Sequence, residues 1–141
     1  MTDPTDLPAA VVERLRRRDA TTRIAVVGAS NDPAKYGNVV VCNLSSKGYA
    51  VLPVNPGEKE IAGLPSFPDV ASAPGPIHVA VFVTPPPVTL RVLQSLDPAR
   101  IDAVWFQDGS FDDAVLADAG QRFANVVHHA CIMVVTAALK A

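Results

Sequence analysis

The sequence predicts an α/β fold with three layers, α/β/α, around a mainly parallel sheet of five or six strands. Short apolar runs alternate along the chain with segments whose apolar residues recur at helical spacing, a pattern typical of βαβ units. The runs are apolar throughout, as expected for strands that helices cover on both faces. The 13 prolines cluster near the ends of these runs, where a residue without an N–H group does not interrupt a sheet.

Length and composition fit one folded domain. The chain has 141 residues, of which 49% are hydrophobic and 18% are charged, so wholesale disorder is excluded. The net charge of -2 offers no basic excess for nucleic acid, and no apolar run approaches the ~20 residues of a membrane helix. We therefore expect neither nucleic acid nor a membrane as a partner.

The cysteines and the first residues bear on the compartment. Cys42 and Cys131 lie far apart and in no metal-like spacing, which favours a reduced compartment. Residues 1–8 contain two aspartates and no apolar run, so they predict no signal peptide. A cytoplasmic location is expected.

The first part of the chain predicts two helices and two strands. The helix over residues 8–18 carries an apolar stripe and an arginine cluster, which forms a solvated face or contacts an anion or a partner. This helix and the tail before it make up residues 1–20, and residues 21–141 form the main domain. The arginines are Arg14, Arg16, Arg17 and Arg18, and the next elements are a strand over 24–28, a helix over 37–47 and a strand over 49–54.

The second part continues the alternation. A stretch rich in Pro, Gly and Ser, residues 57–76, is expected to hold only a short helix over 68–73. Ser110 and Asp113 have the spacing of a capping box, and residues 132–141 close the fold as a strand or a helix. Between these lie strands over 78–83 and 103–106, a helix opened by Pro85 to Pro87, a helix that ends near Phe123 and a strand that begins at Val126.

The turn after the first strand predicts a nucleotide site. Five strands wound both ways from the first give a Rossmann-like sheet, whose ligand lies beyond the carboxyl ends of the strands. Gly28 permits a tight exit, and the N–H groups after it suit a pyrophosphate. The turn is not the fingerprint G-x-G-x-x-G, because Ser30 replaces the second glycine and the next one is Gly37. The Ser30 hydroxyl can donate a hydrogen bond to a phosphate, and Lys35 can add a positive charge near it.

The end of the second strand argues against NAD. NAD-binding domains usually carry Asp or Glu there to hold the ribose, whereas this chain has Asn55-Pro56-Gly57. Asparagine can still bond a ribose or adenine edge, and the missing carboxylate removes a repulsion that would exclude a ribose phosphate. Coenzyme A carries such a phosphate, and Lys59 either meets it or is a solvated loop lysine. Coenzyme A is therefore the expected ligand.

Three segments, residues 24–30, 48–56 and 105–110, resemble the small stand-alone CoA-binding protein family. Its members are Rossmann domains related to the CoA-binding domain of the succinyl-CoA synthetase α subunit. The similarity extends over about residues 21–135, and the segment from Gly48-Tyr49 to Asn55-Pro56 is its most specific part. Where family members often carry an Asp-Arg-Cys-like segment, this chain has residues 128–131 as His-His-Ala-Cys, so no role of that arginine transfers.

The resemblance implies a CoA-binding Rossmann-like domain over residues 21–141, with coenzyme A held across the strand ends. The cofactor-binding residues that it implies are Gly28, Ala29 and Ser30 at the pyrophosphate, Asn55 and Pro56 at the adenosine, Lys35 or Lys59 near phosphates, Val83, Thr84 and Pro85 as a wall, and Phe106, Gln107 and Asp108 on the pantetheine side.

No known catalytic set appears in the sequence. His78 is expected to be structural, and His128 and His129, adjacent on a strand, to point to opposite faces, one of them as a candidate base at the pocket mouth. Cys131 is a buried, inert thiol, a nucleophile or a redox thiol, and Cys42 is a buried, inert thiol. No Ser-His-Asp or His-Cys-Asp set stands at a known spacing, and no metal site is expected.

The favoured function is a CoA or acyl-CoA binding protein without catalysis of its own. One alternative is a nucleotide-dependent enzyme, either an NAD(P) oxidoreductase or a protein that transforms acyl-CoA. Another is an interaction subunit with a vestigial pocket. A homodimer or a protein partner also stays open.

Overall fold

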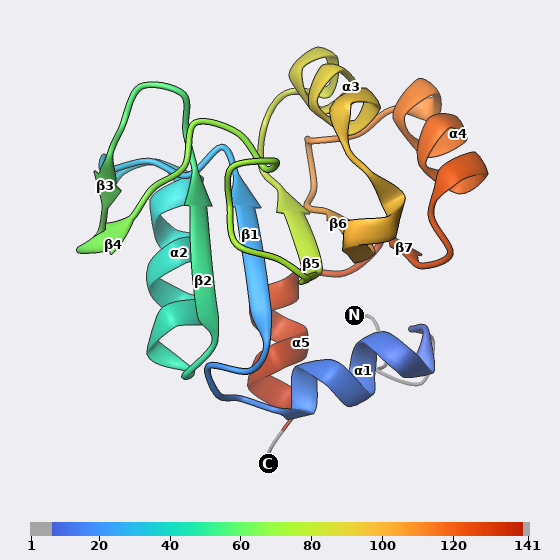
Figure 1. The fold of residues 1–141 in the computed structure, drawn as a ribbon. Coiled ribbons are helices and arrows are strands. Elements are labelled where there is room, and N and C mark those ends of the chain that lie inside the picture. The colour runs from blue at the N-terminus through green and yellow to red at the C-terminus, as the bar shows by residue number, and fades with distance from the viewer. Residues whose placement is uncertain (1–6, 140–141) are drawn as a thin grey trace.

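A computed structural model describes residues 7–139 and has the three predicted layers (Figure 1). The sheet has five strands in the order β2-β1-β5-β6-β7, and every neighbouring pair is parallel. The predicted α/β class and parallel sheet are therefore confirmed. The strands are β1 (Arg23–Val27), β2 (Ala50–Val54), β5 (Ile77–Phe82), β6 (Ile101–Phe106) and β7 (Val126–Val127).

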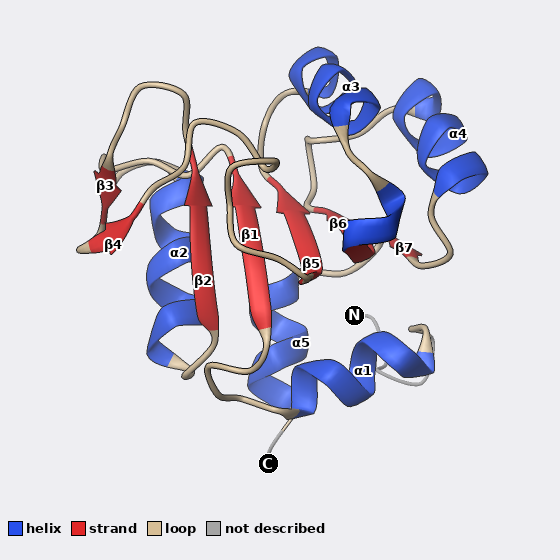
Figure 2. Ribbon diagram, viewed as in Figure 1, coloured by secondary structure: helices blue, strands red, loops and turns tan. Residues whose placement is uncertain are grey.

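Helices cover both faces of this sheet (Figure 2). Successive residues of β1 point to opposite sides, so Ile24 joins one apolar core and Ala25 the other. The first core packs against α1 (Ala9–Arg16), α2 (Tyr36–Ser46) and α5 (Ile132–Ala138), and the second against α3 (Pro86–Ser95) and α4 (Asp113–Arg122). Burial on both faces explains why the strands have no polar side.

The strand order creates a switch point between β1 and β5. From β1 the chain winds to β2 at one edge of the sheet, and it then crosses to β5 on the other side of β1. In open parallel sheets ligands bind at such a point, outside the carboxyl ends of the strands. The fold therefore directs attention to the residues that follow β1 and β5.

The stretch between β2 and β5 differs from the prediction. It forms a two-stranded hairpin, β3 (Glu60–Ile61) with β4 (Leu64–Pro65), and residues 68–73 form turns rather than a helix. The Asp69 side chain accepts hydrogen bonds from the N–H and hydroxyl groups of Ser72, which closes a local turn. Pro74 and Pro76 follow at once, so the turn cannot extend into a helix.

Helix boundaries also differ in detail. The side chain of Asp112, not Ser110, caps α4 by accepting from the N–H of Val115. Ser110 instead donates to the carbonyl of Gln107. The segment predicted as a strand or a helix over residues 132–141 is helix α5. Its last two residues, 140–141, lie outside the described residues. A 3-10 turn, Pro98–Arg100, precedes β6.

The large aromatic of β6 lies in the core. Trp105 is fully buried, and its indole N–H donates to the carbonyl of Ala130. Within residues 7–139 no helix combines the length and apolarity needed to cross a bilayer.

Candidate functional site

A cleft of about 470 Å³ lies at the carboxyl ends of β1 and β2, under α3. We call it the strand-end cleft. Its walls come from the β1–α2 loop, the residues after β2, the turn at residues 68–70 and one side of α3. The predicted residues that line it are Gly28, Ala29, Ser30, Lys35, Asn55, Pro56 and Thr84.

Two glycines let the chain pass closely through this site. Gly28 has a φ of +97°, and a Cβ there would lie 2.9 Å from methyl carbons of both Val83 and Thr84. Gly37, in the first turn of α2, packs so closely that a Cβ would collide with the Gly28 carbonyl oxygen. A side chain at either glycine would displace α2 or the β5 end from β1.

The loop after Gly28 carries free hydrogen-bond donors. The backbone N–H groups of Ala29 and Ser30 have no hydrogen-bond partner within residues 7–139, and neither do those of Tyr36 and Gly37 at the start of α2. Free amides at a helix N-terminus favour an anion, because the helix dipole adds a partial positive charge there. This arrangement is the one that the sequence predicted for a pyrophosphate.

Asn55 links the ends of the first two strands. Its side-chain amide donates to the carbonyl of Ala29 at 2.9 Å, and its side-chain oxygen accepts from the N–H of Gly57 at 2.8 Å. Both polar ends of the side chain are therefore engaged within the protein. Asn55 holds the Ala29 loop in place, whereas the sequence suggested a direct bond to the nucleotide.

Two cations line the strand-end cleft. Lys35 precedes α2 and Arg91 lies on α3, and neither side chain has a partner within the described residues. The one carboxylate of the lining, Asp69, accepts from Ser72, which lowers its pKa. Sequence reasoning missed Arg91. The signal was present, because Arg91 is the only charged residue of the helix that opens after β5.

Thr84 and its neighbours complete the wall at β5. The hydroxyl groups of Thr84 and Thr89 are 2.7 Å apart, and Thr89 also donates to the Thr84 carbonyl. This pair fixes the β5–α3 junction. Val83 packs beside Gly28 and Pro85 is the N-cap residue before α3, but neither lines the strand-end cleft itself.

Four predicted residues lie elsewhere. Lys59 is exposed on the loop before β3, and Asp108 is exposed after β6. Phe106 is fully buried and packs against Phe82, with ring centroids 5.2 Å apart. Gln107 is buried and engaged by other protein groups, so none of the four contributes to the strand-end cleft.

Gln107 belongs to a polar cluster with Tyr36 and Cys131. Its side-chain amide lies 2.6 Å from the Tyr36 hydroxyl and 3.3 Å from the Cys131 sulfur, and its oxygen accepts from the N–H of Ile132. Burial of Cys131 acts to raise its pKa, but hydrogen bonds from Tyr36, Gln107 and the amides of α5 outweigh burial, so the pKa is lowered. Burial, with the bond to Cys131, raises the pKa of Tyr36 to about 12, so Tyr36 stays a donor.

The remaining histidines and cysteine correct three expectations. His128 and His129 follow β7 rather than lie on it, and their ring centroids are 3.6 Å apart, so they do not point to opposite faces. Burial and the neighbouring His129 lower the pKa of His128. Cys42 is exposed on α2, not buried. Among residues 7–139 no group of three or more His, Cys, Asp or Glu side chains is placed to hold a metal ion.

Comparison with known proteins identifies relatives of two sizes. Over 63 residues the chain is 44% identical to the α subunit of the ADP-forming acetate–CoA ligase II of Pyrococcus furiosus, a match that covers 44% of this chain and 14% of the ligase subunit. It is 26% identical over 132 residues to the uncharacterized protein YneT of Bacillus subtilis, with 94% and 96% of the two chains covered. The chain thus spans only a small part of the ligases but nearly all of the small relative.

Solved structures give the same picture. A conserved hypothetical protein from Pyrococcus furiosus has 41% sequence identity and a TM-score of 0.76, over 80% of this chain and 97% of that one. A hypothetical protein from Pyrococcus horikoshii has 29% identity and a TM-score of 0.81, over 99% and 97% of the two chains. The family model described as CoA binding domain matches residues 22–137, which include every element from β1 to the last full turn of α5. The chain therefore belongs to the CoA-binding domain family.

Proposed function

We propose that the chain binds coenzyme A or an acyl-CoA in the strand-end cleft and catalyses no reaction of its own. The diphosphate lies on the free amides of Ala29 and Ser30, and the adenosine lies along Asn55 and Pro56. Lys35 and Arg91 neutralise part of the phosphate charge. Val83, Thr84 and Pro85 hold the β5 side of the site in shape.

The observation that carries the proposal is the pair of unpartnered N–H groups at Ala29 and Ser30, at the switch point of the sheet. Buried backbone donors nearly always have partners in folded proteins, and Ala29 is 1% exposed. A phosphate oxygen would supply the missing acceptors. Membership of the CoA-binding domain family supports coenzyme A as the molecule that carries the phosphate.

Selectivity over NAD follows from the second strand end. No carboxylate stands after β2 to hold a free ribose, because Asn55 and Pro56 occupy that place. Two cations flank the cleft, whereas its one carboxylate already has hydrogen-bond partners. Coenzyme A carries a ribose phosphate that NAD lacks, so the excess of positive charge favours coenzyme A.

Isothermal titration calorimetry with coenzyme A, NAD⁺ and NADP⁺ tests the proposal. We expect saturable heat with coenzyme A and weaker binding of both dinucleotides. Ser30→Tyr places a ring in the strand-end cleft and should abolish binding of coenzyme A. Ser46→Tyr, the same change at an exposed position at the other end of α2, is the matched control and should bind normally. Absence of heat with coenzyme A, or tighter binding of NAD⁺, would refute the proposal.

A second candidate function, acyl transfer to Cys131, is favoured by the hydrogen bonds that lower the pKa of this thiol. The Cys131 thiolate would attack the carbonyl carbon of an acyl thioester, forming a new sulfur–carbon bond. The bond between that carbon and the sulfur of coenzyme A would break, and coenzyme A would leave as a thiolate. Mass spectrometry after incubation with acetyl-CoA would show one acetyl group on Cys131, retained in Cys42→Ser and lost in Cys131→Ser.

A further inference from the structure

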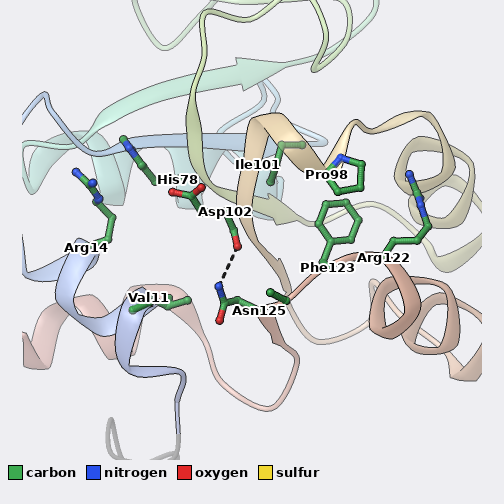
Figure 3. Close-up of a pocket in the computed structure, with 11 residues that line it drawn as sticks. Val11, Arg14, His78, Pro98, Ile101, Asp102, Arg122, Phe123 and Asn125 are labelled. Atoms are coloured by element: carbon green, nitrogen blue, oxygen red, sulfur yellow. Dashed lines mark hydrogen bonds between the residues drawn. The ribbon is translucent and has the colours of Figure 1, made fainter.

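A second cavity, of about 530 Å³, lies at the opposite end of the sheet from the strand-end cleft. We call it the amino-end cavity. It is enclosed by α1, the first residues of β5 and β6, and the connection from α4 to β7. Figure 3 shows its polar side chains His78 and Arg14 at one end and the rings of Pro98 and Phe123 at the other.

His78 presents a donor that the protein does not use. The side chain is 7% exposed, and its Nδ1 accepts a hydrogen bond from the N–H of Arg23 at 2.9 Å. The proton of the neutral ring is therefore on Nε2. Nε2 has no hydrogen-bond partner within residues 7–139 and is not fully buried, so its N–H is free to donate to a ligand in this cavity.

Arg14 provides an unpaired positive charge beside it. Its side chain lines the amino-end cavity, is half-buried, and makes no ion pair or hydrogen bond within the described part of the chain. Arg122, which also lines the cavity, differs, because its guanidinium donates to the carbonyls of Leu93 and Leu96 and pairs with Asp118. Arg14 is thus the lining arginine that remains available to a ligand.

The electrostatic surroundings of His78 are predominantly positive. Burial lowers the pKa of His78 first, and the charges of Arg14, Arg23 and Arg17 lower it further. Asp102, exposed at the cavity, acts in the opposite direction. An anion bound between Arg14 and His78 would meet two donors and a field that favours negative charge.

At the other end of the amino-end cavity Pro98, Ile101 and Phe123 form an apolar wall next to the already paired Arg122 (Figure 3). Val11 lies on α1, on the same side as Arg14. We propose that the amino-end cavity binds a small carboxylic acid anion with an apolar body, whose carboxylate contacts Arg14 and His78 and whose body lies against Ile101 and Phe123. Pockets for small molecules commonly combine such an apolar wall with a few converging polar groups.

Three probes of similar shape test the charge and the polarity together. They are phenylacetate, 2-phenylethanol and benzylamine, which are anionic, neutral and cationic. Each is titrated into the labelled full-length protein while NMR follows the His78 ring and the Ile101 methyl groups. We expect saturable shifts with phenylacetate only, and a rise in the pKa of His78 in its complex, because a bound anion favours the imidazolium form.

Two variants, one that removes a positive charge from the cavity lining and one that removes a negative charge, test the role of charge directly. Arg14→Gln should weaken phenylacetate binding about tenfold, as expected for loss of one charge-assisted hydrogen bond. Arg16→Gln, on the same helix but outside the cavity lining, should leave it unchanged. Asp102→Asn removes the opposing carboxylate and should tighten binding about two- to fivefold, within the range for an exposed charge.

Several outcomes would overturn the proposal. Benzylamine binding more tightly than phenylacetate would make Asp102 the recognising group. Equal binding of all three probes would show that the amino-end cavity recognises only the apolar ring and not the charge. No shift with any probe would show that the cavity binds none of these molecules. Arg14→Gln should bind coenzyme A as tightly as the unchanged protein does. A failure of the anion proposal for the amino-end cavity can therefore be distinguished from a failure of the coenzyme A proposal for the strand-end cleft.

Discussion

The strand-end cleft and the amino-end cavity are built from different chemical groups. In the strand-end cleft the backbone amides of Ala29 and Ser30 are free beside the unpaired side chains of Lys35 and Arg91, while the side chain of Asn55 is engaged within the protein. In the amino-end cavity the free donors are side chains, Arg14 and His78. A backbone site is therefore sensitive to changes that move the chain, whereas a side-chain site is sensitive to loss of one group.

The largest effect should follow Gly28→Val, which moves the chain at the strand-end cleft. The residue has a φ of +97°, and the added atoms would collide with Val83 and Thr84. We expect a loss of about 1–3 kcal/mol in the free energy of unfolding, the usual cost of such strained backbone. We also expect loss of coenzyme A binding. Urea denaturation and calorimetry measure the two effects.

Gly109→Ala separates strain from collision. Gly109 has a φ of +85°, but a Cβ there would meet nothing within 4 Å. This variant should lose stability through the backbone alone and should keep coenzyme A binding. If Gly28→Val binds coenzyme A as well as Gly109→Ala does, the strand-end cleft does not depend on the tight turn, and the comparison fails.

Asn55→Asp tests the support of the loop rather than the turn. Aspartate keeps the acceptor for the N–H of Gly57 but replaces the donor to the Ala29 carbonyl with a negative oxygen. Leaving that carbonyl opposed by a carboxylate should cost about 1–3 kcal/mol of stability and weaken coenzyme A binding. Asn55→Ala, which removes both bonds without adding charge, should bind coenzyme A more tightly than Asn55→Asp. The reverse order would make charge near the phosphates irrelevant.

The sequence was sufficient to predict much of the fold and the backbone part of the strand-end cleft. Runs such as Ile24 to Gly28 are local, and their apolar character follows directly from burial on both faces. Parallel strands place all their carboxyl ends at one edge, so the order of the strands along the chain was enough to group Gly28, Asn55 and Thr84. The failed helix over 68–73 shows the limit, because Pro74 and Pro76 stop the turn that the Asp69 side chain caps before it can become a helix.

Groups brought together by tertiary packing could not be predicted in this way. Arg14 on α1 and Asp102 on β6 are distant in sequence and line the same cavity only because α1 packs across the amino end of the sheet. The same is true of Tyr36 and Cys131, which are 95 positions apart. Spacing rules describe one helix or one strand, so they carry no information about such contacts.

Acidification should affect the amino-end cavity through His78. Burial, followed by the charge of Arg14, lowers the pKa of His78 below its ordinary value of 6.5. On acidification the unfolded chain therefore takes up this proton first. The stabilisation is complete above pH 6.5 and is lost as the pH falls through the lowered pKa. In His78→Asn this loss should disappear, because asparagine can still accept from Arg23 but does not titrate.

Urea denaturation at a series of pH values measures how steeply the free energy of unfolding falls on acidification. His129→Asn replaces an exposed histidine and should retain this pH dependence. If the free energy of unfolding of His78→Asn falls with acidification as steeply as that of the unchanged protein, another group causes the acid sensitivity. The charge of Arg14 would then affect the pH dependence of stability less than the contrast between the two sites implies.

The smallest effect is expected from Tyr36→Phe, which removes one hydroxyl beside the strand-end cleft. The Tyr36 hydroxyl lies 3.5 Å from the Cys131 sulfur, and this bond helps to lower the pKa of the thiol. Its loss should raise the pKa of Cys131 and slow its alkylation by iodoacetamide near neutral pH, since the thiolate is the reactive form. The stability cost should be about 0.5–1.5 kcal/mol, that of an ordinary hydrogen bond.

Tyr49→Phe is the matched control, measured like Tyr36→Phe in a Cys42→Ser background. The Tyr49 hydroxyl donates to the carbonyl of Leu15, in the core under α1, so its removal costs a hydrogen bond of the same kind. Alkylation of Cys131 should not change in this variant. Equal alkylation rates in both variants would show that the thiol is controlled by the amides of α5 rather than by a side chain. The thiol beside α2 would then depend on backbone groups, as the amide part of the strand-end cleft does, which would strengthen the contrast with the amino-end cavity.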